Sequence, residues 1–263
     1  MNKSTHTNDV VTLLSIPFEK LDKREAYTRL EQAIKTDRRC TKVYTPNPQM
    51  LLKAHGTPAL RNLLSRADLL LPDGIGLCIG ARLLGSPLPC RIAGIDAGRE
   101  VLVMAEKRGL SVALLGAAPG VADRAAKRLR HELPHLRICY THHGYFDRMG
   151  AENEAILAEL RAVAPDILFV CFGFPAQESW IDQNAHKLPS LRLCMGLGGS
   201  LDVWAGNVRR APRTVSACGL EWLWRVLCEP RRARIFLDIP HFLFLVLRQR
   251  IQEPSKRAVA ERK

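Results

Sequence analysis

The chain lacks any long apolar stretch. Among its 263 residues, no run approaches the roughly 20 apolar residues needed to cross a bilayer, and the nearest, 235–247, is short and carries Asp238, Pro240 and His241. Residues 1–9 are polar and have no apolar core of the kind found in signal peptides. The sequence therefore predicts a cytoplasmic protein that neither crosses a membrane nor is exported.

Paired cysteines and metal-ligand spacings are also missing. The eight cysteines form no Cys-x-x-Cys pair, and several lie in apolar runs, as Cys171 does after 167–170. Such thiols are typical of small buried side chains in a reducing compartment, and they argue against a disulfide framework or a zinc site. His131 and His135 are separated by Pro134, which would break a helix carrying both. We expect no metal and no cofactor.

The motifs of several functional classes are absent. The chain has no Gly-x-Ser-x-Gly elbow, no Gly-x-x-x-x-Gly-Lys-Ser/Thr loop and no Asp-x-Asp. The first absence disfavours hydrolase chemistry with a serine nucleophile. Neither helix-turn-helix nor zinc-finger patterns accompany the net charge of +13, so we expect no nucleic-acid partner.

The excess positive charge is concentrated near the C-terminus. Residues 206–263 hold 13 Lys and Arg against 5 Asp and Glu, and arginines alternate there with Trp222, Trp224 and leucines. Basic groups flanking aromatic and leucine-rich helices suit the anionic interface of a membrane. A helix that packs on the core and exposes an arginine face is the alternative that the sequence leaves open.

Polar side chains follow two strand-like runs at the point where each run breaks on a proline. Thr45 and Asn47 follow the run 42–44, and Asp73 follows the run 68–71. The carboxyl ends of neighbouring strands form the ligand crevice of an open α/β sheet, so these side chains are expected to point at one place. Asp73 is a candidate general base, or else it caps the helix that follows.

One helix is expected between these two strands. Thr57 followed by Pro58 is typical of a helix start, with the threonine hydroxyl as its N-cap. The leucines at 60, 63 and 64 then form one apolar stripe.

The second half repeats the order of apolar run, glycine-rich turn and helix. Gly116 ends the run 111–115, and backbone amides at the start of the next helix favour phosphate. Later runs end in turns that carry Gln177 and Asp202; Asp202 is a candidate to hold the two ribose hydroxyls, with a helix cap as the alternative. The sequence therefore predicts a sheet that binds a nucleotide along its carboxyl edge.

These motifs together resemble the WecG/TagA/CpsF family of bacterial glycosyltransferases. The matching segments run in family order over about residues 40–235: TPNPQ (45–49), LPDGIG (71–76), RIAGID (91–96), LGA (115–117), GYF (144–146), FGFPAQE (172–178), GLGG (196–199), RAPR (210–213), GLEWL (219–223) and EPRR (229–232). A set of this length is far more specific than any of its members.

The resemblance implies a Rossmann-like α/β fold of the class called GT-E, with a mostly parallel sheet and a C-terminal helical appendage that docks on the membrane. It implies transfer of a sugar, often N-acetylmannosamine or its uronate, from a UDP-sugar to undecaprenyl-diphosphate-linked N-acetylglucosamine, with inversion. Some relatives instead add glucose to longer lipid-linked oligosaccharides. A nucleotide-binding or membrane-scaffold protein without turnover is the alternative from another class.

The resemblance also implies roles for individual residues. Asp73 matches the family's proposed base, while Thr45 and Asn47 would place a sugar and Gln177 would hold it from the facing loop. Arg91 would lie near the reacting groups. Because the chain has no Asp-x-Asp, arginines are expected to stabilise the leaving diphosphate, and the candidates are Arg225, Arg231 and Arg232.

We therefore predict a glycosyltransferase domain at 1–207, a basic helical appendage at 208–253 and a disordered tail at 254–263. The expected partners are a UDP-sugar, a polyprenyl-diphosphate-linked acceptor and an anionic membrane surface, at the inner face of the plasma membrane. Self-association is an expectation that rests on the resemblance alone.

Overall fold

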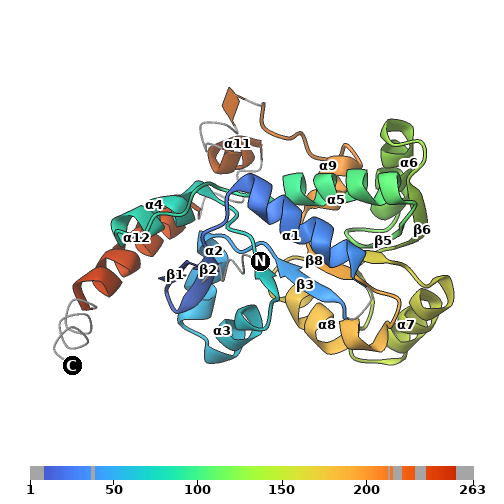
Figure 1. Ribbon diagram of the computed structural model, residues 1–263, viewed down its shortest axis with the longest axis horizontal. Coiled ribbons are helices and arrows are strands. Elements are labelled where there is room, and N and C mark those ends of the chain that lie inside the picture. Colours follow the sequence, from blue (N-terminus) through green and yellow to red (C-terminus); the bar gives the residue numbers. More distant parts are fainter. Residues whose placement is uncertain (1–8, 37–38, 213, 216–220, 229–234, 253–263) are drawn as a thin grey trace, which may run out of the picture.

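A six-stranded parallel sheet forms the centre of the molecule, with helices on both of its faces (Figure 1). The computed structural model describes residues 9–36, 39–212, 214–215, 221–228 and 235–252. The strand order is β4-β3-β8-β7-β5-β6. The strands are β3 (Thr41–Tyr44), β4 (Leu69–Leu70), β5 (Ser111–Gly116), β6 (Arg137–His142), β7 (Ile167–Cys171) and β8 (Leu193–Gly196). The predicted α/β fold with a parallel sheet is confirmed.

Two apolar cores lie on the two faces of the sheet. The first contains residues of α1 (Lys23–Lys35), α5 (Gly94–Arg108), α6 (Val121–Glu132) and α9 (Ser200–Trp204). The second contains residues of the antiparallel hairpin β1 (Val10–Leu13) and β2 (Ile16–Glu19), and of α2 (Pro48–His55), α3 (Pro58–Ser65), α4 (Ile75–Leu83), α7 (Ala151–Val163), α8 (Ala176–Asn184), the 3-10 turn η1 (Ala185–Lys187) and α12 (Ile235–Gln252). Because the central strands are buried on both sides, they are continuous apolar runs rather than alternating ones.

The expectation of one helix between β3 and β4 is wrong, because two helices fill this connection. The side chain of Asn47 accepts a hydrogen bond from the Met50 amide and Pro48 takes the first helical position, so α2 begins inside the motif that follows β3. Helix α3 begins after Thr57 as predicted, but the Thr57 hydroxyl makes no capping hydrogen bond.

Helix α12 has two different faces. One packs on α4 and α2, where Phe242 and Val246 are fully buried. The opposite face exposes large apolar side chains: Leu237 is 74%, Phe244 62% and Ile251 76% exposed. The buried face agrees with the core-packing alternative, but the exposed face carries large apolar side chains, and contact with a membrane stays a prediction.

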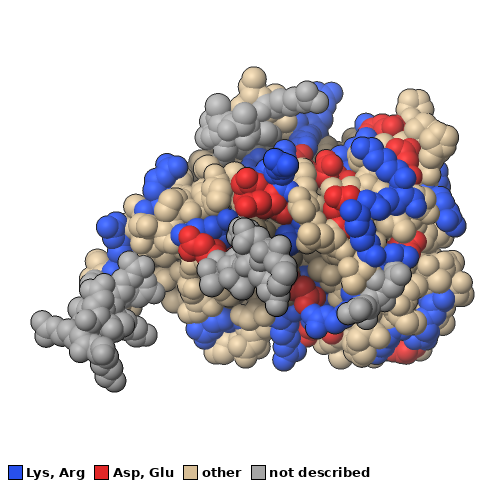
Figure 2. Space-filling model, in the orientation of Figure 1, with Lys and Arg blue, Asp and Glu red and all other residues tan. Residues whose placement is uncertain are grey.

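The C-terminal region also contains α11 (Glu221–Cys228), and the predicted boundaries at 207 and 253 stay predictions. The predicted tail lies outside the described residues. Within the described residues, no helix is long and apolar enough to cross a membrane. On the face shown in Figure 2, Lys and Arg are spread widely, with acidic side chains among them over the part formed by α1 and α5.

Candidate active site

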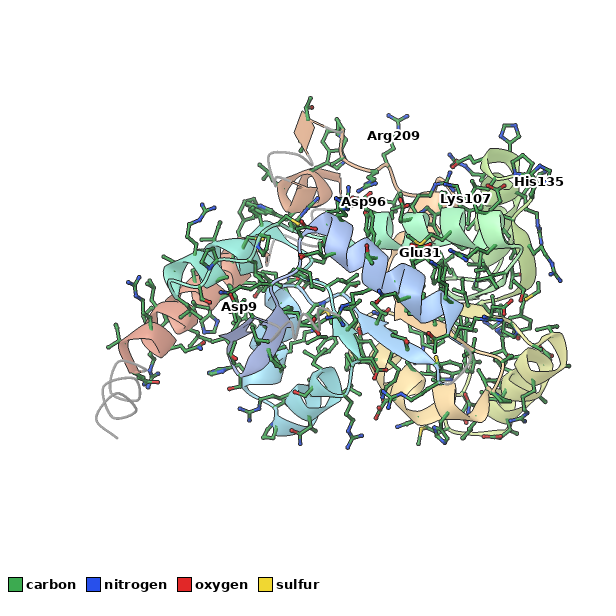
Figure 3. All side chains as sticks on the ribbon, viewed as in Figure 1. Asp9, Glu31, Asp96, Lys107, His135 and Arg209 are labelled. Atoms are coloured by element: carbon green, nitrogen blue, oxygen red, sulfur yellow. The ribbon has the colours of Figure 1, made fainter. Side chains whose placement is uncertain are left out.

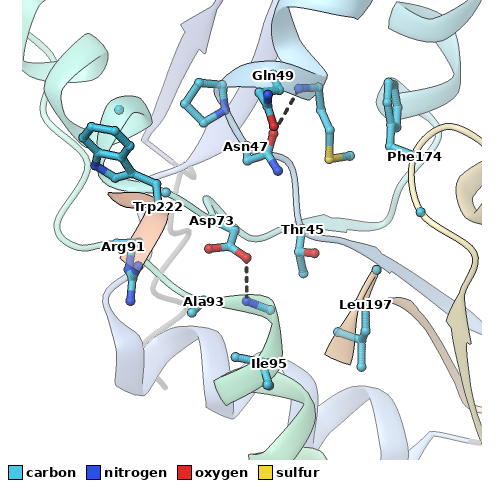
Figure 4. Close-up of a pocket in the computed structure, with 18 of the residues that line it drawn as sticks. Thr45, Asn47, Gln49, Asp73, Arg91, Ala93, Ile95, Phe174, Leu197 and Trp222 are labelled. Carbon is cyan, nitrogen blue, oxygen red and sulfur yellow. Dashed lines mark hydrogen bonds between the residues drawn. The ribbon is translucent and has the colours of Figure 1, made fainter. Parts of the chain in front are cut away.

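A pocket of about 400 Å³ opens at the carboxyl end of the sheet. Its walls come from the loops after β3, β4, β7 and β8, from the start of α5, and from α11 and α12. All five residues predicted to be catalytic line it: Gln177, together with Thr45, Asn47, Asp73 and Arg91. Figure 4 labels the last four. The strand order explains this meeting, since β3 lies between β4 and β8, and β7 is the next strand.

The carboxylate of Asp73 is held by a helix distant in sequence. Its Oδ2 accepts a hydrogen bond of 3.1 Å from the amide of Gly94, the first residue of α5, while its own amide donates to Pro46. The helix that directly follows Asp73, α4, has Gly74 as its N-cap and no side-chain capping bond. Asp73 therefore sits at a helix N-terminus, where a negative charge is favoured, but the helix is α5 and not the one expected.

Thr45 lies against the same glycine. Its hydroxyl donates to the Gly196 carbonyl at 3.1 Å, and the side chain is 9% exposed. A Cβ at Gly94 would lie 2.8 Å from Oγ1 of Thr45, which is too close for an unstrained structure. Gly94 therefore allows α5 to approach β3 closely enough to place Thr45 and Asp73 in one pocket.

Asn47 has a structural role beside the predicted one. Its Oδ1 accepts the capping bond from Met50, so this oxygen is occupied. Figure 4 shows its amide nitrogen pointing toward the side of the pocket that holds Asp73 and Thr45. The nitrogen is thus the polar atom of Asn47 placed to meet a ligand.

Gln177 lines the pocket, but its amide is engaged by the protein. The side chain is 3% exposed; Oε1 accepts hydrogen bonds from the amides of Gly173 and Gly198, and Nε2 donates to Glu178. That Gln177 holds the sugar stays a prediction. The structure adds that its side chain joins the loops that contain Gly173 and Gly198.

Two predicted nucleotide contacts are not among the residues that line this pocket. Gly116 is the last residue of β5, where a Cβ would lie 2.5 Å from the carbonyl oxygen of Cys171. Asp202 lies in the first turn of α9, and its carboxylate accepts from the Asn207 amide at 3.4 Å. Close strand packing therefore explains the glycine at 116, and the nucleotide roles of both residues stay predictions.

The three arginines predicted to stabilise the diphosphate are only partly described. Arg225 belongs to α11, but the structure does not describe its side chain. Arg231 and Arg232 lie outside the described residues. Their roles stay predictions.

An ion pair ties the segment before α11 to α5. Arg210 and Asp96 approach to 2.7 Å. Asp96 lies at the start of α5 (Figure 3). Burial alone would raise the pKa of Asp96, but the hydrogen bond and charge of Arg210 outweigh it and hold that pKa below its ordinary value.

The pocket also contains residues that sequence reasoning missed. Gln49 donates to Asp238 of α12 at 2.5 Å, and the Lys53 ammonium lies 6.0 Å from the centre of the Phe174 ring. Trp222 of α11 lines the pocket as well. Gln49 and Lys53 are four residues apart, which places them on one face of a helix. Had α2 been predicted, this spacing would have indicated that both side chains face the pocket. Among the described residues, no cluster of three or more His, Cys, Asp or Glu is suited to a metal ion.

Comparison with known proteins points to one family. The sequence model described as "Glycosyl transferase WecG/TagA/CpsF family" matches residues 11–256. A relative from Bacillus spizizenii is 36% identical, and the alignment covers 78% of each chain. Relatives from Bacillus subtilis (79% of each chain) and Staphylococcus aureus (78% of each chain) are both 33% identical. All three are named N-acetylglucosaminyldiphosphoundecaprenol N-acetyl-beta-D-mannosaminyltransferase.

Proposed function

Because this chain belongs to the WecG/TagA/CpsF family of glycosyltransferases, we propose that it transfers N-acetylmannosamine, or its uronate, from a UDP-sugar to N-acetylglucosaminyl-diphosphoundecaprenol. The names of the three relatives support this acceptor and the mannosaminyl group. The product would be a lipid-linked disaccharide used in bacterial surface-polysaccharide synthesis.

The proposed reaction is a single displacement with inversion. Asp73 takes the proton of the acceptor hydroxyl, the hydroxyl oxygen forms a bond to the anomeric carbon, and UDP leaves from the opposite face with the electron pair of the broken bond. Thr45 and Asn47 position the reacting sugars. Arg91, with Arg225, Arg231 and Arg232, stabilises the charge that develops on the diphosphate, so that no metal is needed.

The observation that carries this proposal is the placement of Asp73. Its carboxylate lies in a pocket with Thr45, Asn47 and Arg91, and an amide at the N-terminus of α5 fixes its orientation. A general base must be held in this way to accept a proton from one direction. A carboxylate that merely capped α4 would need neither the pocket nor the contact with α5.

We further propose peripheral attachment to the inner face of the plasma membrane. The exposed apolar side chains of α12 and the basic residues near it support this attachment, since apolar contact and charge together hold interfacial helices on anionic lipid. The lipid-linked acceptor would then reach the pocket from the membrane side, because Ile239 of α12 also lines the pocket.

The test is release of UDP from a panel of donors in the presence of EDTA. The panel holds UDP-linked N-acetylmannosamine, its uronate, glucose and N-acetylglucosamine, each with and without a short-chain polyprenyl-diphosphate N-acetylglucosamine acceptor. We expect acceptor-dependent release from the mannosaminyl donors only. Release only with a longer lipid-linked oligosaccharide and UDP-glucose would identify a glucosyltransferase instead. Binding of nucleotide and vesicles without any release would identify a non-catalytic scaffold.

A further inference from the structure

Behind the pocket lies a carboxyl group that the proposed chemistry does not use. Glu178 in the first turn of α8 is completely buried, and its Oε1 accepts a hydrogen bond of 2.8 Å from Nε2 of Gln177. Its Oε2 has no hydrogen-bond partner in the described part of the chain. Burial raises the pKa of Glu178 to about 7, although the Gln177 hydrogen bond opposes the rise.

Gln177 joins two loops at the floor of the pocket. Its Oε1 accepts from Gly173, after β7, at 3.2 Å and from Gly198, after β8, at 2.9 Å. Both glycines have positive φ values, +79° and +52°, so each loop bends sharply at the residue whose amide Gln177 holds. One oxygen atom therefore bonds to both loops and adds to the backbone pairing of β7 with β8.

The same side chain supports Thr45 indirectly. Gln177 packs on Gly196 so closely that a Cβ there would lie 2.9 Å from Nε2. The carbonyl of Gly196 accepts the hydroxyl hydrogen bond of Thr45. A shift of Gln177 would therefore move the segment that orients a predicted sugar contact.

The oxygen and nitrogen of an amide have nearly the same shape, so Gln177 needs a partner to select one orientation. If the amide were reversed, its NH₂ group would face the two amide donors of Gly173 and Gly198. The two glycine amides disfavour this reversal, and an acceptor beside Nε2 disfavours it further; Glu178 is that acceptor. An apolar residue of similar volume would fill the space without the cost of burying a carboxyl group, but it would leave Nε2 buried without an acceptor, and the two glycine amides alone would then hold the orientation.

We propose that Glu178 is a positioning residue for sugar transfer, which orients Gln177 so that this amide holds the loops after β7 and β8 in their reactive arrangement. The expected effect on kcat rests on the function proposed above. The structural part, the orientation of Gln177, stands without it.

The charged groups around Glu178 are engaged elsewhere. Lys42 of β3 and Arg66, the residue that follows α3, both pair with Asp182 of α8, at 2.9 and 2.7 Å. The hydroxyl of Tyr44 donates to the backbone oxygen of Glu178 and not to its carboxyl group. Among the described residues, the Gln177 amide is therefore the side-chain partner of the carboxyl group, and the backbone of Glu178 itself also stabilises its charged form.

The experiment compares Glu178→Leu and Glu178→Gln in the full chain, with Gln183→Leu as the control on an exposed face of α8. Amide hydrogen exchange at Gly173 and Gly198 is measured by NMR without substrate, and UDP release is measured with substrates. For Glu178→Leu we expect exchange at both glycines to rise about tenfold or more, and kcat to fall by a similar factor with little change in KM. Glu178→Gln keeps an acceptor oxygen beside Nε2, so it should recover most of both. Gln183→Leu should match the wild type in both measurements.

Wild-type exchange and kcat in Glu178→Leu would overturn the proposal. So would a Glu178→Gln protein that is folded but as impaired as Glu178→Leu, because an acceptor would then not be sufficient. If Glu178→Leu does not fold, the side-chain NH₂ signals of Gln177 in Glu178→Gln decide: slow exchange relative to exposed Gln183 supports the orientation, and equal exchange overturns it. If the wild type transfers no sugar, the proposed function fails while the exchange data still test the orientation of Gln177.

Discussion

Asp73 is the residue on which the proposed chemistry depends, because it is the carboxylate that the structure holds in the pocket by a hydrogen bond from α5. Replacing it by asparagine keeps the shape and the hydrogen bond from Gly94 but removes the proton acceptor. We expect kcat to fall by about 10²–10⁴, the usual contribution of a general base, with donor KM nearly unchanged. Initial rates of UDP release between pH 6 and 9 measure this. The control is Asp147→Asn, in an exposed loop away from the pocket. If Asp73→Asn kept most of its turnover at every pH, Asp73 would not be the general base.

Gly94 links the base to Thr45 through close packing. In Gly94→Ala the new Cβ would meet the Thr45 side chain at 2.8 to 3.0 Å, so α5 or Thr45 must move. Packing strain of this kind usually costs about 1–3 kcal/mol, and we expect activity to fall at least about tenfold while the protein stays folded. Gly56→Ala is the matched control, since nothing lies within 4 Å of a Cβ there and φ is −80°. Equal activity of the two variants would mean that the contact with Thr45 does not matter.

The buried carboxyl group of Glu178 makes a specific prediction for pH. Because its pKa is raised to about 7 in the folded protein, it stabilises the fold relative to an unfolded chain at low pH, and this contribution is lost as pH rises from about 4.5 through 7. Glu178→Gln does not titrate. The free energy of unfolding of the wild type should therefore fall relative to this variant between pH 5 and 8, by on the order of 3 kcal/mol at most. Urea unfolding of both proteins at the two pH values measures the difference, and a constant difference would show that Glu178 stays in one protonation state.

At the scale of helices and strands, local sequence patterns predicted the parallel sheet and the two strand ends that carry Thr45 and Asp73. They did not predict α2, because Asn47 and Pro48 were interpreted as site residues only and not also as a helix start. The partner of Asp73 is 21 residues away, and the amide partners of Gln177 come from two different loops. Contacts of this kind depend on which strands are neighbours, and periodicity within one segment carries no information about that.

Helix α12 offers a matched pair of identical side chains for testing its two faces. Phe242 is fully buried beside Gly80 of α4, whereas Phe244, two residues later, is 62% exposed. Phe242→Ala should lower the free energy of unfolding by about 3–5 kcal/mol, the usual cost of emptying an aromatic site in a core. Phe244→Ala should change it by less than about 0.5 kcal/mol. Denaturant unfolding measures both, and similar losses in the two variants would contradict the described packing of α12.

At the scale of the whole molecule, the packing of α12 affects how membrane attachment can be tested. Cutting the chain after residue 207 would remove Phe242 and Val246 from the core, so a loss of activity would not distinguish membrane docking from damaged folding. Substitutions on the exposed face avoid this difficulty. They leave the contacts with α2 and α4 in place.

Leu237→Ser, Phe244→Ser and Ile251→Ser combined should separate membrane binding from stability. These side chains are 62% to 76% exposed, so little burial is lost in the free protein, and unfolding should shift by less than about 1 kcal/mol. Each apolar side chain placed in the interface contributes on the order of 1 kcal/mol, so the triple variant should bind anionic vesicles at least about tenfold more weakly.

Cosedimentation at low and high salt measures this binding, because the electrostatic part decreases with ionic strength and the apolar part does not. Transfer to a short-chain acceptor in solution should stay at the wild-type rate, since none of the three residues lines the pocket. Unchanged vesicle binding by the triple variant would mean that this face of α12 does not contact lipid.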